Sequence, residues 1–163
     1  MNPSGILDPA FGNGALTPSL KVLFVLTVLA LLPAVILTMT SFVRTVVVLS
    51  FVRQGVGTQV PPSQVVIGLA LFLTLFTMSP VVESMKAAAY DPYMRGEVTD
   101  MQALELASVP LKKFMLRETR EADLRMFYSV TKTPLPASPE DVPMRLAAPA
   151  FVVSELTTAF QMG

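Results

Sequence analysis

Three carboxylates in the stretch "RETREADLR" (117–125) are the nearest this sequence comes to a catalytic acid pair. General acid–base chemistry needs two such groups whose surroundings push their pKa values apart. Here the carboxylates are interleaved with bases, which is the usual pattern of a solvated, ion-paired helix surface. No nucleophile–base signature accompanies them, so the sequence favours a non-enzymatic protein. The acids are Glu118, Glu121 and Asp123, and the bases are Arg117, Arg120 and Arg125.

Histidine and cysteine are both absent from the chain. Their absence excludes disulfides, thiolate nucleophiles, imidazole catalysis and the usual zinc sites. The glycines Gly55 and Gly57 lie in "GVGTQ", which lacks the third glycine and the preceding strand of a dinucleotide-binding loop. These two glycines predict a turn, and no cofactor or metal is expected.

The composition divides the chain into a membrane-type half and a soluble-type half. Of the 163 residues, 52% are hydrophobic and 15% are charged, and the mean hydropathy is +0.59. Between Lys21 and Glu83 the only ionised side chains are Arg44 and Arg53, whereas acids and bases are frequent and balanced from Glu83 to Arg145. The net charge is zero and there is no basic face, so a nucleic-acid partner is not expected.

The stretch Val22–Val43, "VLFVLTVLALLPAVILTMTSFV", predicts a helix that crosses a bilayer. It is uncharged and exceeds the roughly 20 residues that a crossing needs. Pro33 lies near its middle, where it removes a hydrogen bond and favours a kink. Such prolines are tolerated where neighbouring helices compensate.

The apolar pattern continues past Arg44 to Arg53. A single helix from Leu20 to Arg53 would be about 51 Å long at about 1.5 Å per residue. The hydrocarbon core is only about 30 Å thick, and ordinary tilts do not absorb the difference. Two interpretations stay open: Arg44 ends the crossing and Thr45–Val52 forms a buried turn, or the helix outgrows the membrane and packs on other protein.

A turn follows in "RQGVGTQVPPSQ", where Pro61 and Pro62 prevent a regular continuation. Ser63 is predicted to cap a second helix, Gln64–Met78. The uncharged stretch 65–82 around it reaches the length of a membrane span. The first half is therefore predicted to be a helical hairpin.

The soluble half begins at Asp91-Pro92 and is also predicted to be helical. Thr99 and Gln102 have the spacing of a capping box, which predicts a helix that ends before Pro110. Thr119 is predicted to cap a further helix, whose first turn carries Glu121 and Asp123.

A proline-rich loop, "TKTPLPASPEDVP", leads to a final helix predicted from Pro149. Glu155 lies beside the apolar stripe of this helix, so it is either a solvated residue at the rim or an ion-pair partner at an interface. Phe114 and Phe127 are either core residues or contacts between subunits.

The fold class predicted from these patterns is all-α. The predicted organisation is an irregular lead-in (1–19), a hydrophobic hairpin (20–90), a small helical domain (91–145) and the start of a further helix (146–163). The bases of the hairpin loop place residues 44–59 in the cytoplasm and both chain ends outside.

Three segments in order resemble one known family. "MTSFVRTVVVLSFVRQGVGTQVPPSQVVIGLALFLTLFTMSP" (39–80), "PLKKFMLRETREADLRMF" (110–127) and "VPMRLAAPAFVVSELTTAFQMG" (142–163) closely resemble the FliP/SctR family of type III secretion export-gate subunits. The middle segment is most similar to the flagellar branch. The resemblance covers residue 20 to the end of the chain.

The resemblance implies a subunit of the bacterial inner membrane, in the flagellar basal body, with residues 91–145 in the periplasm. Its expected partners are further copies of itself, FliQ/SctS-type and FliR/SctT-type subunits, unfolded export substrates and the lipid bilayer. It also favours subunit-interface roles for Phe114, Phe127 and Glu155. The hairpin residues Arg44, Arg53, Pro61 and Pro62 are the other candidates for subunit contacts.

Two departures from the family pattern are expected to matter. Members usually carry a signal before the first hydrophobic segment and a further hydrophobic hairpin after the last matching motif, so this chain is expected to be a C-terminally truncated member. The alternatives to a flagellar export-gate subunit are a virulence-type (injectisome) gate subunit and a small membrane transporter. A proton-driven transporter usually carries acids or histidines at membrane depth, and the stretch from Lys21 to Glu83 holds neither.

Overall fold

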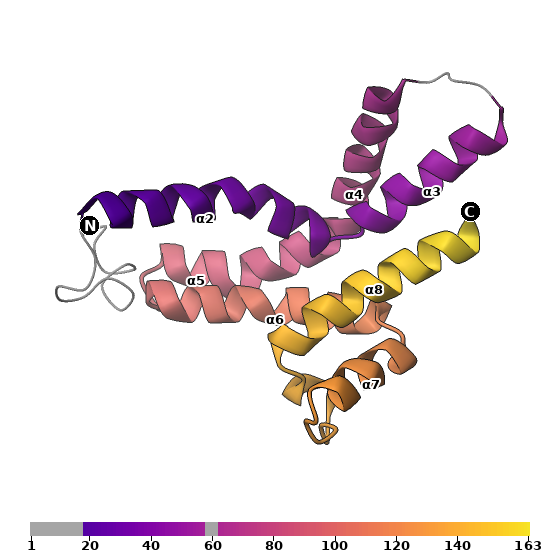
Figure 1. Cartoon of the computed structure of the whole chain (residues 1–163). Coiled ribbons are helices and arrows are strands. Elements are labelled where there is room, and N and C mark those ends of the chain that lie inside the picture. Colours follow the sequence, from indigo (N-terminus) through magenta and orange to yellow (C-terminus); the bar gives the residue numbers. More distant parts are fainter. Residues whose placement is uncertain (1–17, 58–61) are drawn as a thin grey trace.

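The computed structural model describes residues 18–57 and 62–163, and every regular element within them is helical. The predicted all-α class is confirmed for this part of the chain (Figure 1). The elements in order are α2 (Pro18–Thr38), α3 (Phe42–Gly55), α4 (Ser63–Met85), the π-helix η1 (Lys86–Tyr90), α5 (Asp91–Met94), α6 (Asp100–Glu118), α7 (Glu121–Val130), the 3₁₀ helix η2 (Pro139–Asp141) and α8 (Met144–Met162).

Two helices, α2 and α3, occupy the stretch that one of the two interpretations treats as a single long helix from Leu20 to Arg53. Their axes differ by 65° across the break between Thr38 and Phe42. The hydroxyls of Thr38 and Thr40 donate to the carbonyls of the turn before them, at 2.9 and 3.0 Å. The helix breaks here and not at Pro33, which lies inside α2. The prediction of a continuous helix is wrong.

The second helix is longer than predicted. It runs without interruption from Ser63 to Met94 through α4, η1 and α5, past the predicted end at Met78. Among the described residues it is the one unbent helix long and apolar enough to cross a membrane, and the bent α2–α3 pair passes the same test when taken together. Pro62 is the N-cap residue and makes no side-chain cap bond, so the predicted capping role of Ser63 is wrong.

The capping box predicted at Thr99 is present. The Thr99 hydroxyl accepts the backbone N–H of Gln102, and the Gln102 side chain accepts the backbone N–H of Thr99. The predicted end before Pro110 is wrong, because α6 continues to Glu118. The turn after Pro110 buries Phe114 and Met115, and this packing outweighs the hydrogen bond that the proline removes.

The start of α7 differs from the prediction in its cap alone. Thr119 ends α6, with its hydroxyl donating to the Met115 carbonyl at 2.7 Å, and Arg120 is the N-cap residue of α7. Glu121 and Asp123 lie in the first turn of α7, as predicted, where their charge favours the helix N-terminus.

The final helix starts at Met144, before the predicted start at Pro149. It packs against α3, α6 and α7 and lies between the α3–α4 hairpin and α7 in Figure 1. Its buried residues join two apolar clusters. The first cluster contains Met78, Val81, Phe114, Met115 and Phe151, and the second contains Tyr128, Val142, Leu146 and Ala147.

Candidate functional site

Arg44 lies at the centre of a charge cluster formed by three helices. From α3, its Nε and Nη2 donate to the two carboxylate oxygens of Glu155 on α8, at 2.9 and 2.6 Å. The same Nη2 donates to Glu118 at the end of α6, at 2.8 Å. Arg117 donates to the other oxygen of Glu118 at 3.2 Å from the surface. We call Arg44, Glu118 and Glu155 the charge cluster.

Burial is uneven within the charge cluster. The Glu155 side chain is only 1% exposed, whereas the side chains of Arg44 and Glu118 are about a quarter exposed. Glu155 is buried because it follows Phe151 and Ser154 on the inward face of α8. The predicted alternative of a rim-exposed Glu155 is therefore wrong. Its ion-pair partner in this structure belongs to the same chain.

The two carboxyl groups respond to this environment in opposite directions. Burial raises the pKa of Glu155 above its ordinary value, and the hydrogen bonds from Arg44 offset this only in part. Partial burial also raises the pKa of Glu118, but hydrogen bonds from Arg44 and Arg117 outweigh it, so that pKa is lowered overall. The pair shares one guanidinium, and such buried charges are stable only while their partner stays in place.

A second polar network joins α7 to α8 next to the charge cluster. The fully buried Ser154 accepts the backbone N–H of Arg120 at 3.0 Å and donates to the Asp123 carboxylate at 2.6 Å. The Arg120 guanidinium donates to the side chain of Gln161, about two turns further along α8 than Ser154. These contacts fix the start of α7 against α8.

The three carboxylates considered as an acid pair do not converge. Glu118 faces Arg44, Asp123 accepts from Ser154, and Glu121 accepts from Arg125 on the surface of α7 at 2.6 Å. Each carboxylate accepts a hydrogen bond from a different partner, so no two of them form an acid pair. Within the described residues there is also no group of three or more metal-ligating side chains. The arrangement is suited to fixing helices.

The other predicted hairpin residue, Arg53, bonds across the hairpin itself. Its Nη1 donates to the Ser63 hydroxyl at 2.9 Å and so links the end of α3 to the start of α4. Gly57 allows the chain to leave α3 because its φ is +71°, a conformation that favours glycine. Pro62 precedes α4, and Pro61 lies outside the described residues.

The apolar residues between the two arginines contact protein in this structure. Residues 42–51 of α3 are half-buried, and α3 packs against both α4 and α8. Near the end of α8, the rings of Phe51 and Phe160 lie 5.5 Å apart, and Gly163 lies so close to Phe51 that a Cβ atom would not fit. The stretch is neither a buried turn nor the end of one long helix.

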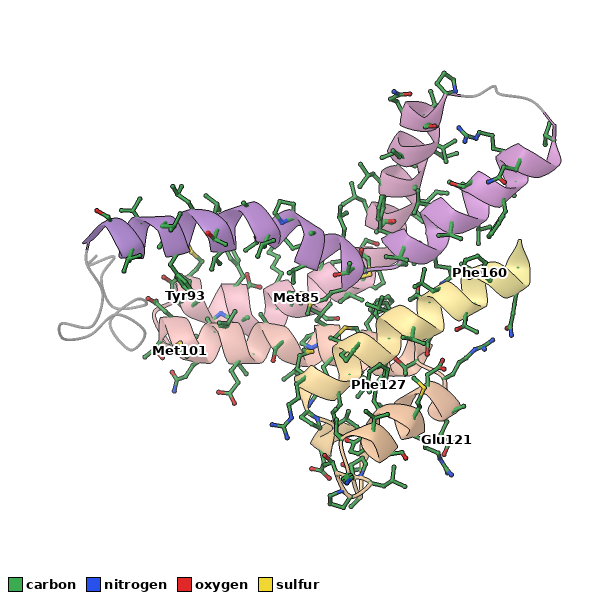
Figure 2. All side chains as sticks on the ribbon, in the orientation of Figure 1. Met85, Tyr93, Met101, Glu121, Phe127 and Phe160 are labelled. Carbon is green, nitrogen blue, oxygen red and sulfur yellow. The ribbon has the colours of Figure 1, made fainter. Side chains whose placement is uncertain are left out.

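Phe114 and Phe127 both pack inside the chain, to different extents. Phe114 is 4% exposed and meets Phe151 edge to face at 5.6 Å. Phe127 is half-buried against the second apolar cluster, on the side of α7 that lies near α8 in Figure 2. Their assignment to a subunit interface stays a prediction.

The charge cluster corrects the predicted membrane orientation at one point. Arg44 was assigned to the cytoplasm and Glu118 to the periplasm, yet the two side chains are 2.8 Å apart. Two groups in contact lie on the same side of a bilayer. The predicted assignment of Arg44 and Glu118 to opposite sides of the membrane is therefore wrong.

Sequence reasoning missed Ser154 and its bond to Asp123. A signal was present, because Ser154 and Glu155 form a polar pair within the otherwise apolar stretch 146–156. Buried polar groups are nearly always hydrogen-bonded, so such a pair predicts partners on neighbouring elements. It does not predict which ones.

Comparison with known proteins shows which family this chain resembles. The model of the FliP family matches residues 25–163. The chain is 46% identical to the flagellar biosynthetic protein FliP of Pectobacterium carotovorum subsp. carotovorum over 98% of this chain and 63% of that protein. It is 44% identical to FliP of Aquifex aeolicus, over 93% of this chain and 64% of the relative.

The Bacillus subtilis flagellar biosynthetic protein FliP is also 44% identical, over 89% of this chain and 66% of that protein. The chain thus spans just under two thirds of the length of these relatives. The matched region includes the hairpin, the charge cluster and both apolar clusters. The family model covers most of the sequence, and the chain belongs to the FliP family.

Proposed function

We propose that this chain is a structural, non-catalytic subunit of the flagellar type III protein export gate in the bacterial inner membrane. Its membership of the FliP family supports this function, and the relatives named above are all flagellar proteins. This favours the flagellar system over a virulence-type one. In this proposal, copies of the chain assemble with FliQ/SctS-type and FliR/SctT-type subunits. The assembly passes unfolded flagellar proteins across the membrane.

The observation that carries this proposal is the apolar surface left uncovered on α2 and α4. On α4, Phe72, Leu75 and Phe76 are 66%, 72% and 75% exposed, and α2 is apolar on all its faces. Exposed apolar surface of this extent marks contact with lipid or with other proteins. The axes of α2 and α3 differ by 65°, so a bilayer with a hydrocarbon core about 30 Å thick would cover only part of these helices. Neighbouring subunits are proposed to cover the rest.

The charge cluster has a structural role in this proposal. Helix–helix contacts in a membrane rely on close packing and on polar side chains more than on hydrophobic attraction. Arg44 binds Glu118 and Glu155 and thereby holds α3 at a fixed place on α6 and α8. The hairpin is then presented to neighbouring subunits as a rigid unit, with its apolar faces outward.

The proposed location places residues 91–145 in the periplasm together with Arg44, and the tip of the α3–α4 hairpin toward the cytoplasm. The positive charge of Arg53 near this tip supports that orientation. Figure 1 shows the end of α3 and the start of α4 on the side of the molecule away from α7, which fits a hairpin that enters the bilayer from one side.

Disulfide cross-linking tests the assembly, because the chain contains no cysteine of its own. The variants Leu29→Cys on α2 and Phe76→Cys on α4 place single thiols on the exposed apolar faces. Each variant is co-expressed with the FliQ-type and FliR-type subunits and oxidised in isolated membranes. We expect cross-linked species that contain two copies of the chain or one copy and a partner.

Val130→Cys is the matched control, because Val130 is 74% exposed on α7, away from the hairpin. It is expected to cross-link much less than the hairpin positions. The proposal fails if thiols placed along α2 and α4 react with lipid-soluble maleimide but never cross-link. It also fails if the chain remains a monomer when all partners are present.

A further inference from the structure

Two carboxylates compete for one guanidinium in the charge cluster. Nη2 of Arg44 donates to Glu155 at 2.6 Å and to Glu118 at 2.8 Å, and Nε donates to Glu155 at 2.9 Å. When both carboxyl groups are ionised, two negative charges therefore face the single positive charge between them. Carboxylates that share a site in this way repel each other, which favours the uptake of a proton by one of them.

Glu155 is the member of the pair that is suited to accept this proton. Its side chain is 1% exposed, and Arg44 is the one base that the described residues place against it. Glu118 is a quarter exposed and also accepts from Arg117 at the surface. Burial raises the pKa of Glu155, and the negative charge of Glu118 adds to the rise, which Arg44 offsets in part. The unequal burial and the unequal number of partners thus select Glu155.

Each helix packed against α8 brings charged side chains to the surroundings of Glu155. These side chains are Arg44 on α3, Glu118 and Arg117 on α6, and Arg120 and Asp123 on α7. The two on α7 bond Gln161 and Ser154 of α8, so they are already engaged and do not replace Arg44. The charges that act on the pKa of Glu155 are those of Arg44 and Glu118.

Protonation of Glu155 weakens the link between α3 and α8. Hydrogen bonds between ionised groups are about twice as strong as those between neutral groups, so the guanidinium is then held mainly by Glu118 on α6. Beyond the ion pair, α3 and α8 meet near their ends at the rings of Phe51 and Phe160. Phe160 is 65% exposed, toward the end of α8 in Figure 2, so this second contact is only partly shielded from solvent.

We propose that the charge cluster is a pH-sensitive switch that controls how the end of α8 is held on the hairpin. With Glu155 ionised, Arg44 joins α3 to α8. With Glu155 protonated, Arg44 pairs with Glu118 alone, and the end of α8 separates from α3 while α3 stays on α6. The inference rests on contacts within one chain and does not depend on the proposed function.

Distances between spin labels test the switch, because the chain contains no cysteine of its own. Gln54→Cys on α3 and Met162→Cys at the end of α8 place the labels at exposed positions. The full chain in dodecyl maltoside is measured by electron paramagnetic resonance from about pH 8 to about pH 5, above the ordinary glutamate pKa of about 4.3. No histidine of the chain titrates in this range, because it has none.

We expect one short distance at the high-pH end and a second, longer distance whose population grows several-fold as the pH falls. Gln54→Cys with Gln64→Cys reports on the α3–α4 hairpin and is the matched control. Its distance should not change over the same range, because no part of the charge cluster lies on α4. Circular dichroism at each pH checks that the helical content stays constant.

Two conservative changes separate the roles of the carboxyl groups. Glu155→Gln copies the protonated form and should show the longer distance at every pH. Glu118→Gln removes the second acceptor, so Arg44 stays on Glu155 and the short distance should persist over the whole range. Glu105→Gln, an exposed change on α6, is the matched control and should keep the pH response of the parent chain.

Three results would overturn the switch. They are a distance that does not respond to pH in the parent chain, a short distance at every pH in Glu155→Gln, and a full pH response in Glu155→Gln. The last result would show that another group titrates. If Glu155→Gln loses helical content, carbon NMR of labelled glutamate carboxyls in the parent chain supplies the test. The resonance that is lost in Glu155→Asp should titrate together with the distance, and titration at the ordinary glutamate value would contradict the proposal.

Discussion

The guanidinium of Arg44 binds the carboxylate of Glu155 through two hydrogen bonds, of 2.9 and 2.6 Å, across 111 positions of sequence. Glu155 is buried, and Glu118 bonds the same guanidinium from a third helix. A bidentate pair fixes both distance and orientation, so it sets how α3 lies on α8. The placement of the whole hairpin depends on this contact.

Removing one member of this pair should destabilise the fold strongly. Arg44→Met leaves the buried Glu155 charge without its partner, which is expected to cost about 3 kcal/mol in the free energy of unfolding. Adding Glu155→Gln removes that charge and should recover much of the loss. Denaturant unfolding in detergent measures both variants. Arg125→Met breaks an exposed pair with Glu121 and should cost no more than about 0.5 kcal/mol. Equal effects of Arg44→Met and Arg125→Met would contradict the buried role.

The charge cluster also predicts how stability depends on pH. The pKa of Glu118 is lowered in the folded state, so this group stabilises the fold above its unfolded value of about 4.3, and the contribution is lost as the pH falls. The melting temperature of Glu118→Gln should therefore fall less on acidification than that of the parent chain. Glu105→Gln, an exposed change on the same helix, is the control.

Glu155 contributes with the opposite sign. Its pKa is raised in the folded state, so protonation favours the fold as the pH drops through that raised value toward the unfolded one. Glu155→Gln removes this gain, and its melting temperature should fall more steeply on acidification than that of the parent chain. If the melting temperatures of Glu118→Gln and Glu155→Gln fall equally on acidification, the pKa values of the two groups are not shifted in opposite directions.

Ser154 should be sensitive to loss of its hydroxyl. Ser154→Ala leaves the half-buried backbone N–H of Arg120 and carboxylate of Asp123 without this partner, at a cost of about 1–3 kcal/mol. Ser129→Ala, on the exposed side of α7, should be close to neutral. Hydrogen exchange at the start of α7 would report the local loosening. Unchanged exchange in Ser154→Ala would mean that the bonds contribute nothing to holding α7.

The two phenylalanines considered for subunit contacts should behave differently. Phe114→Ala creates a cavity in the first apolar cluster and is expected to cost about 3–5 kcal/mol in the isolated chain. Phe127 is half-buried, so Phe127→Ala should cost less. A loss of native-gel complexes in Phe114→Ala therefore indicates an interface only if the monomer remains folded by circular dichroism. Phe114→Leu, which keeps most of the volume, provides that comparison.

Thiol labelling checks the proposed orientation of the chain. Gln102 lies on α6 and Gln54 near the hairpin tip, and both are exposed. In intact spheroplasts, a membrane-impermeant maleimide should label Gln102→Cys and leave Gln54→Cys unlabelled until the membrane is opened. Labelling of Gln54→Cys alone would reverse the orientation, and labelling of both in intact cells would remove the membrane crossing.

Local features of the fold were predictable from the sequence. The capping box depends on Thr99 and Gln102, which are three positions apart, and it forms as predicted. The acidic first turn of α7 is equally local. The end of a helix could not be predicted from a nearby proline. Pro110 lies inside α6 because distant residues on α4 and α8 bury the turn that follows it.

The sequence by itself determined the all-α class, the two long apolar segments and the family. These depend on composition, on patterns within one or two helical turns and on motifs of contiguous residues. Only the tertiary structure decided that Arg44 bonds Glu155 and Glu118 and that Ser154 joins α7 to α8. Each of these contacts requires helices that are far apart in the sequence to pack against one another in one particular alignment. The free energy of that meeting comes from packing over whole helix faces, which no local pattern specifies.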